Sequence, residues 1–331
     1  MFTIGSYGIA VFMCIITMIC WGSWANTQKL TTTPFQLFYW DYGLGVLILS
    51  LLAALTLGSH GELGRSFLPD LLQAQSGNMG LAFLSGVIFN LANLLLVAAI
   101  DIAGMSVAFP IAIGLALVLG VIINYLAQPL GNPQLLTVGV ILVVFAMIFS
   151  ANAYARMNKS GEKGGKGGII ISLISGILMG LFFRFIAASM SSDFSNPEIG
   201  KLTPYTASVI FSLGIVISSL IFNTWMIKKP LSGNPLTGYS YAKLSFGAHL
   251  VGILGGAIWA IGTLLSLLAA DKAGFAISYG LGQGATMIAA LWGVFVWKEF
   301  KNAPTGTNWR LTLMFLCYLC GLILIILSKV V

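Results

Sequence analysis

Residues 84–114 read LSGVIFNLANLLLVAAIDIAGMSVAFPIAIG, and residues 254–284 read LGGAIWAIGTLLSLLAADKAGFAISYGLGQG. At a constant offset of 170, both contain the frame Asp-x-Ala-Gly, beginning at Asp101 and at Asp271. Shared Leu and Ala positions carry little weight, because apolar segments match easily by chance. The Asp-x-Ala-Gly frame is more specific, and it indicates that the chain contains an internal repeat. Each Asp precedes an apolar segment and is expected to cap the helix that follows.

The composition around these stretches predicts a membrane protein. Of the 331 residues, 58% are apolar and 8% are charged, whereas a soluble domain is typically about a quarter charged. Ten apolar segments reach the roughly 17–25 residues that a helix needs to cross a bilayer. They are 6–27, 36–57, 79–100, 103–127, 135–154, 168–190, 205–227, 246–270, 273–298 and 309–329. Lipid offers no partner to unpaired backbone groups, and the alternating segments of a β-barrel are absent. The chain is therefore expected to be an all-α polytopic membrane protein with ten transmembrane helices.

The repeat divides the ten spans into two sets of five. The same offset also pairs Thr33-Pro34 with Thr203-Pro204, before the second and seventh spans. Because five is odd, the second set must be inverted in the membrane relative to the first. The expected organisation is a first five-helix repeat at 1–157, a linker rich in Gly and Lys at 158–168, and a second, inverted repeat at 169–331. Inverted repeats with a binding site at their interface are typical of secondary transporters.

The distribution of Lys and Arg predicts the orientation. Of the sixteen basic residues, eleven are assigned to loops on one side, four to the other side, and Arg184 lies within a span. Basic loops stay in the cytoplasm. Both termini are therefore expected outside the cytoplasm, and the linker 158–168 inside it, in a multi-pass protein of the cell (inner) membrane. The net charge of +7 follows from this topology and does not indicate nucleic-acid binding.

Several short stretches resemble a known family. They are Asp41-Tyr42, LAALTLG at 52–58, Asn93, Gly104 with Ser106-Val107, Asn124-Tyr125, Pro204-Tyr205-Thr206-Ala207, Trp292-Gly293 and Glu299. These stretches occur in order along nearly the whole chain. Through them, the chain resembles the ureide permease family of the drug/metabolite transporter superfamily. CWGSWANTQKL at 20–30 is similar to the start of bacterial sugar-porter and rhamnose-transporter-like members. The resemblance implies the drug/metabolite transporter fold and proton-coupled uptake of oxo-nitrogen heterocycles such as allantoin or uracil.

Asp41 is the acid that lies most clearly within a span. It is about five residues inside the second span, roughly 7–8 Å deep at about 1.5 Å per residue. A carboxylate at that depth loses hydration, which favours its protonated form. Asp41 is therefore predicted to carry the coupling proton. The alternatives are a carboxylate that reaches the membrane surface and one that is paired with Lys29.

Polar and aromatic side chains within the spans predict a substrate site, because such groups usually face a cavity or a partner helix. Amide side chains match a ring that alternates N–H and C=O groups, and aromatic rings stack on a flat ligand. The residues predicted to bind substrate are Trp21, Asn26, Asn90, Asn93, Arg184, Trp259, Thr263, Tyr279 and Gln283. For the asparagines the alternative is hydrogen bonding between helices, and Arg184 can instead extend towards the membrane surface.

Other functions remain open at this point. Sugars also stack on aromatic faces, so a sugar importer of the same fold is the nearest alternative, and a multidrug or metabolite exporter is another. An enzyme is not expected, because His60 and His249 are the only histidines and lie in or near loops. The four cysteines lie within spans and are expected to pack there, without a metal or other cofactor. The expected partners are the lipid bilayer, a small-molecule substrate and a proton, and the fold requires no oligomer.

Overall fold

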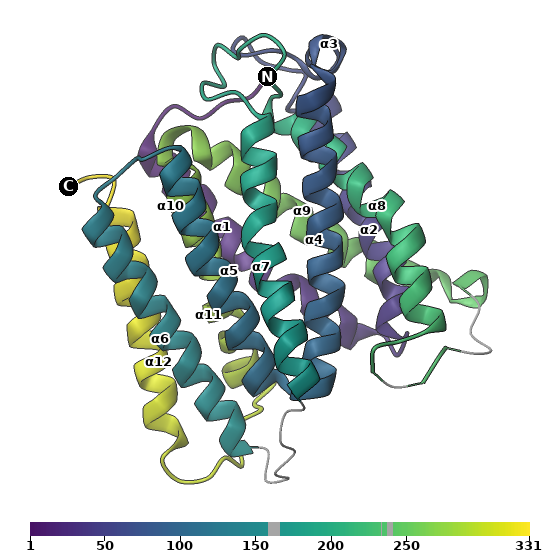
Figure 1. Cartoon of the computed structure of the whole chain (residues 1–331), viewed down its shortest axis with the longest axis vertical. Coiled ribbons are helices and arrows are strands. Elements are labelled where there is room, and N and C mark those ends of the chain that lie inside the picture. The colour runs from purple at the N-terminus through teal and green to yellow at the C-terminus, as the bar shows by residue number, and fades with distance from the viewer. Residues whose placement is uncertain (158–165, 233, 237–240) are drawn as a thin grey trace.

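The computed structural model describes residues 1–157, 166–232, 234–236 and 241–331, which form a bundle of helices (Figure 1). Within these ranges, ten helical segments are long and apolar enough to cross a membrane, which confirms the expected all-α polytopic membrane fold. They are α1 (Tyr7–Ser23) with the 3-10 helix η1 (Trp24–Leu30), α2 (Phe35–Leu55), α4 (Ser76–Ala103), α5 (Met105–Ala127), α6 (Pro133–Met157), α7 (Lys166–Ser189), α8 (Pro204–Lys228), α9 (Phe246–Ala273), the interrupted segment α10 (Phe275–Gly282), α11 (Ala285–Leu291) and the π-helix η3 (Trp292–Val296), and α12 (Thr307–Leu327). The short helices α3 (Phe67–Gln73) and η2 (Tyr241–Lys243) lie between them.

The Asp-x-Ala-Gly frame forms two tight helical hairpins. Gly104 follows α4 with φ of 79°, and Gly274 follows α9 with φ of 85°. Glycine adopts positive φ without the steric cost of a side chain, so α5 and α10 each begin at the next residue. The expectation that Asp101 and Asp271 cap these helices is wrong. Both lie in the last turn of the preceding helix, and no side chain caps α5 or α10.

Two glycines that are 170 positions apart, Gly86 and Gly256, bring pairs of helices into backbone contact. A Cβ atom at Gly86 of α4 would overlap the carbonyl oxygen of Phe211 in α8. A Cβ atom at Gly256 of α9 would likewise overlap the carbonyl oxygen of Tyr42 in α2. Small residues permit this close approach, which is how helices associate in lipid without a hydrophobic driving force. Consequently α4 packs on α8 and α9 packs on α2.

A hydrogen bond between helices also occurs twice. Thr17 in α1 donates to the carbonyl oxygen of Gly262 in α9, and Ser175 in α7 donates to that of Ala92 in α4, each at 2.8 Å. The acceptors are 170 positions apart, the offset at which the Asp-x-Ala-Gly frame recurs, and the donors are 158 positions apart. In this contact, α1 therefore has the same relation to α9 as α7 has to α4.

The ninth span is not the continuous helix expected over 273–298. It is interrupted at Gln283 and Gly284, where the N–H of Gln283 bonds Tyr279 four residues back but that of Gly284 bonds Leu281 only three residues back. Gln283 stands between two glycines, which have low helix propensity, and the break lies in the middle of the bundle.

The helices are arranged in pairs across the molecule. In Figure 1, α6 and α12 lie side by side at one edge, α2 and α8 lie at the other edge, and α4 and α7 lie between them. Both chain termini lie towards the upper end of this view, and the loop between η3 and α12 lies at the lower end. Residues 158–165 of the expected linker lie outside the described residues, and α7 already begins at Lys166.

Candidate functional site

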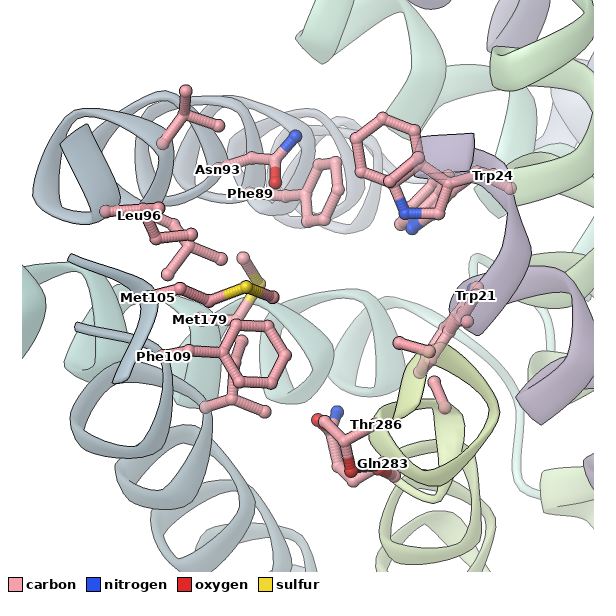
Figure 2. Close-up of a pocket in the computed structure, with 18 of the residues that line it drawn as sticks. Trp21, Trp24, Phe89, Asn93, Leu96, Met105, Phe109, Met179, Gln283 and Thr286 are labelled. Carbon is pink, nitrogen blue, oxygen red and sulfur yellow. Dashed lines mark hydrogen bonds between the residues drawn. The ribbon is translucent and has the colours of Figure 1, made fainter. Parts of the chain in front are cut away.

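A cavity of about 330 Å³ lies between α1, η1, α2, α4, α5, α7, α9 and α11. Figure 2 shows its walls, with Asn93 and Phe89 on one side and Gln283 and Thr286 on the other. The aromatic side chains that line it are Trp21, Trp24, Phe35, Phe89, Phe109, Phe182 and Trp259. None of the described residues that line the cavity is ionisable. A charged ligand would find no side chain of opposite charge among these residues, so the cavity suits a neutral molecule.

The aromatic wall is built around Trp259, which is 4% exposed. Its ring stacks against Trp21 at 6.1 Å between centroids and 13° between planes, and against Phe211 at 5.9 Å and 16°. The indole N–H of Trp21 donates to Thr263 Oγ at 3.1 Å, which holds the ring in this orientation. Packing and this hydrogen bond therefore hold Trp21 and Trp259 in fixed orientations, and both rings contribute aromatic surface to the cavity wall.

Two amides on opposite sides of the cavity supply its main polar groups. Asn93 on α4 donates through Nδ2 to the hydroxyl of Tyr39 at 3.2 Å, so its carbonyl oxygen points into the cavity (Figure 2). Gln283, at the break between α10 and α11, is 8% exposed, and the described residues provide no hydrogen-bond partner for its side chain. The amide of Gln283 can therefore bond a ligand that supplies both a donor and an acceptor.

The structure thus brings four of the predicted binding residues, Trp21, Asn93, Trp259 and Gln283, to the cavity wall and places Thr263 behind Trp21. The remaining four do not line this cavity.

Asn26 and Asn90 bond protein groups elsewhere. Asn26 Oδ1 accepts a hydrogen bond from the indole N–H of Trp297 at 2.7 Å, near the end of η3. Asn90 donates to Ser218 Oγ at 2.7 Å and accepts from Ser219 at 3.3 Å, which joins α4 to α8. Asn90 therefore follows the alternative prediction for the asparagines: it forms hydrogen bonds between helices.

Arg184 and Tyr279 lie towards the end of the bundle that is opposite the α4–α5 hairpin. Arg184 is half-buried on α7 and does not line the cavity. Tyr279 is fully buried, and its hydroxyl lies 3.1 Å from the carbonyl oxygen of Met179 and 3.3 Å from that of Ala116. It closes the space between α10, α5 and α7.

Asp41 is buried in a separate cluster between α2 and α9. Its side chain is 2% exposed, and His249 Nδ1 lies 2.9 Å and 3.0 Å from its two carboxylate oxygens. Tyr241 of η2 also donates its hydroxyl to Asp41. Burial raises the pKa of the Tyr241 hydroxyl well above its ordinary value, and the hydrogen bond to Asp41 raises it further, so this hydroxyl remains a donor at neutral pH. The alternative pairing of Asp41 with Lys29 does not occur, since Lys29 pairs with Glu299 at 3.1 Å.

A chain of aromatic contacts joins this cluster to the cavity. Tyr42, the neighbour of Asp41, lies 4.7 Å from Trp24 between ring centroids. Tyr39 stacks on Tyr42 at 5.0 Å and 15° and receives the hydrogen bond from Asn93. Any displacement of α2 at Asp41 would therefore act on side chains that line the cavity or hold its wall.

The cavity is accessible from one end of the bundle. Its lining residues extend from Trp259 to Ile100 and Met105 at the α4–α5 hairpin, where Met105 is 40% exposed. The opposite end, at Tyr279 and Phe183, is fully buried. The start of α7 lies at the accessible end, because a Cβ atom at Gly168 would meet Ala103 of α4.

Sequence reasoning missed several cavity residues. Phe89, Phe109 and Phe182 are apolar side chains in apolar helices, and nothing local distinguishes them from residues that face lipid. Gln28 is not among the predicted binding residues, but it lines the cavity while its amide donates to the carbonyl oxygen of Thr33 at 2.7 Å. His249 lies in the first turn of α9, next to the preceding loop as expected, but its pairing with Asp41 was not predicted.

Comparisons with known proteins agree with this architecture. A family model described as "Sugar transport protein" matches residues 12–331. Ureide permease 1 of Arabidopsis thaliana is 22% identical and covers 99% of both chains. The glucose uptake protein GlcU of Bacillus subtilis (strain 168) is 24% identical over 66% of this chain and 68% of its own. A crystal structure with 14% identity has a similar fold, with a TM-score of 0.63 over 95% of this chain and 97% of that one.

Proposed function

Because the chain belongs to the sugar transport protein family, whose members are transporters, we propose that it imports small neutral oxo-nitrogen heterocycles, such as allantoin or uracil, together with a proton. The observation that carries this proposal is the cavity itself. It combines stacked aromatic rings, the two amides of Asn93 and Gln283, and a wall without ionisable side chains among the described residues. A flat ring with alternating N–H and C=O groups can pack against the aromatic wall while its edge bonds to the amides.

A sugar importer is the second candidate, favoured by the likeness to a glucose uptake protein. A hexose presents hydroxyl groups around its whole rim, and each needs a partner when it is buried. The cavity offers few polar side chains, and much of its wall is formed by residues such as Leu96, Val97, Ile113 and Met179. This shortage of hydrogen-bond partners supports the heterocycle over the sugar.

The transport cycle that we propose uses the two halves as inverted repeats. The contacts that recur at equivalent positions of the repeat, such as those of Gly86 and Gly256, support a pseudo-symmetric bundle in which the halves exchange conformations. Such an exchange closes one end of the cavity and opens the other. With the orientation given by the basic residues, the accessible end would face the cytoplasm.

Asp41 carries the coupling proton in this scheme, and His249 is its partner. Protonation of Asp41 would weaken its pairing with His249, and with it the contact between α2 and α9. Since α9 carries Trp259 and α2 carries Tyr42, the protonation state of the pair can influence the cavity without direct contact with the substrate. Intramembrane acids that are paired with another ionisable residue are typical of proton relays in transporters.

Quenching of tryptophan fluorescence in the purified protein tests the substrate class, because three tryptophans line the cavity. Allantoin, uracil and glucose are titrated in parallel into the parent protein and into Gln283→Leu. We expect saturable quenching by a heterocycle that is lost or weakened in Gln283→Leu. Saturation by glucose alone would replace the proposal with the sugar importer. Binding of apolar cations alone would favour an exporter.

A further inference from the structure

Tyr279 closes the inaccessible end of the cavity. Its hydroxyl lies 3.1 Å from the carbonyl oxygen of Met179 on α7 and 3.3 Å from that of Ala116 on α5. The ring packs on Phe183 at 5.0 Å between centroids, and Gly120 leaves room for it, since a Cβ atom there would overlap the ring. One side chain thus joins α10 of the second half to α5 of the first half and to α7.

The counterpart of Tyr279 in the first repeat is Phe109, which lines the cavity at the accessible end. At the offset of 170, the acceptor Ala116 corresponds to Thr286, and at the offset of 158, the acceptor Met179 corresponds to Trp21. Thr286 and Trp21 also line the cavity. Phe109, Thr286 and Ala290 also line a second, small void of about 30 Å³. At this end, therefore, empty space borders the ring of Phe109, and Phe109 has no hydroxyl that could bond the elements equivalent to those held by Tyr279.

We propose that Tyr279 is the latch that keeps this end closed, and that the Tyr279/Phe109 difference biases the resting protein towards the conformation described here. The latch rests on the alternating-access part of the proposed function. When the halves exchange conformations, Tyr279 must release both carbonyl groups, while Phe109 closes against Thr286 without gaining a hydrogen bond. The hydrogen bond of the Tyr279 hydroxyl thereby favours the conformation with this end closed over the conformation with the other end closed.

Cysteine labelling tests the latch without any ligand. In a background that lacks Cys14, Cys20, Cys317 and Cys320, one reporter is placed at Ala187, which is 3% exposed at the closed end. At the offset of 158, Ala187 corresponds to Lys29, whose side chain is 45% exposed. When the halves exchange conformations, Ala187 should become exposed in the same way. Ala187→Cys should therefore react with N-ethylmaleimide only when the closed end opens. A second reporter, Ala289→Cys, lies in the cavity wall and reports the accessible end.

Tyr279→Phe should raise the labelling rate of the Ala187 reporter about three- to tenfold, the population change that follows from losing one interhelical hydrogen bond in a membrane protein. The Ala289 reporter should react no faster than before. Phe109→Tyr, which supplies a hydroxyl to the other end, should raise Ala187 labelling as well. The matched control is Tyr125→Phe, which removes a tyrosine hydroxyl that donates to the carbonyl oxygen of Gly131 within the same half at 3.2 Å, and it should change neither rate.

Two results would overturn the latch. One is an unchanged Ala187 rate in both Tyr279→Phe and Phe109→Tyr, when the variants melt as the parent does. The other is a parallel rise at both reporters, which would mean general loosening of the bundle. Uracil and allantoin binding to the parent protein is measured separately. Intact binding with an unchanged reporter refutes the latch alone, whereas absent binding with a responsive reporter refutes only the proposed substrate.

Discussion

Asn93→Ala separates two roles that one side chain performs. Its Nδ2 group bonds the hydroxyl of Tyr39, which is fully buried, while its carbonyl oxygen faces the cavity. Alanine removes both at once. A buried hydroxyl left without its partner costs about 1–3 kcal/mol, with membrane proteins near the lower end, so we expect the variant to be less stable by about 1 kcal/mol.

The effect on binding is larger and can be measured independently. Loss of the carbonyl oxygen leaves an N–H group of the bound heterocycle without an acceptor, at a cost of about 1–3 kcal/mol. That corresponds to roughly a 5- to 150-fold rise in Kd for allantoin or uracil. Fluorescence titration gives Kd, and thermal unfolding of the same samples gives the change in stability.

Tyr39→Phe is the matched control. It removes the same hydrogen bond from the other side and leaves the oxygen of Asn93 in the cavity, so it should lower stability by a similar amount while Kd stays within about twofold of the parent. Equal weakening of binding in both variants would show that Asn93 acts only by holding Tyr39. Parent-like binding by Asn93→Ala would remove Asn93 from the site altogether.

Three further predictions follow from other parts of the molecule. Asp41→Asn should abolish accumulation driven by a pH gradient in proteoliposomes yet preserve exchange of labelled for unlabelled uracil or allantoin; intact accumulation would refute the coupling role. Gly256→Ala should destabilise the protein by about 1–3 kcal/mol through overpacking, because the new Cβ overlaps a carbonyl oxygen of α2, whereas Gly247→Ala on the same helix meets open space and should not; similar melting of both variants would contradict the packing argument. In intact cells, an impermeant maleimide should label Ile199→Cys but leave Asn302→Cys unlabelled, and the reverse pattern would invert the orientation.

The sequence by itself determined that this chain lies in a lipid bilayer and how it divides into membrane-spanning segments. Hydrophobic length is a local property, so ten spans could be counted directly. Trp259 and Gln283 could be selected because polar and aromatic groups are conspicuous within apolar helices. The break at Gln283 was missed, since its flanking glycines are tolerated in membrane helices and do not by themselves end one.

Only the tertiary structure decided which side of each helix faces the cavity. In a soluble protein, a polar face marks the outside of a helix, but lipid is as apolar as a protein interior. Phe89 and Phe182, which line the cavity, therefore have the same local signature as residues that face lipid. For the same reason the pairing of Asp41 with His249, 208 positions away, could not be read from periodicity. It exists because Gly252 and Gly256 let α9 approach α2 closely, and that approach is a property of the packed bundle.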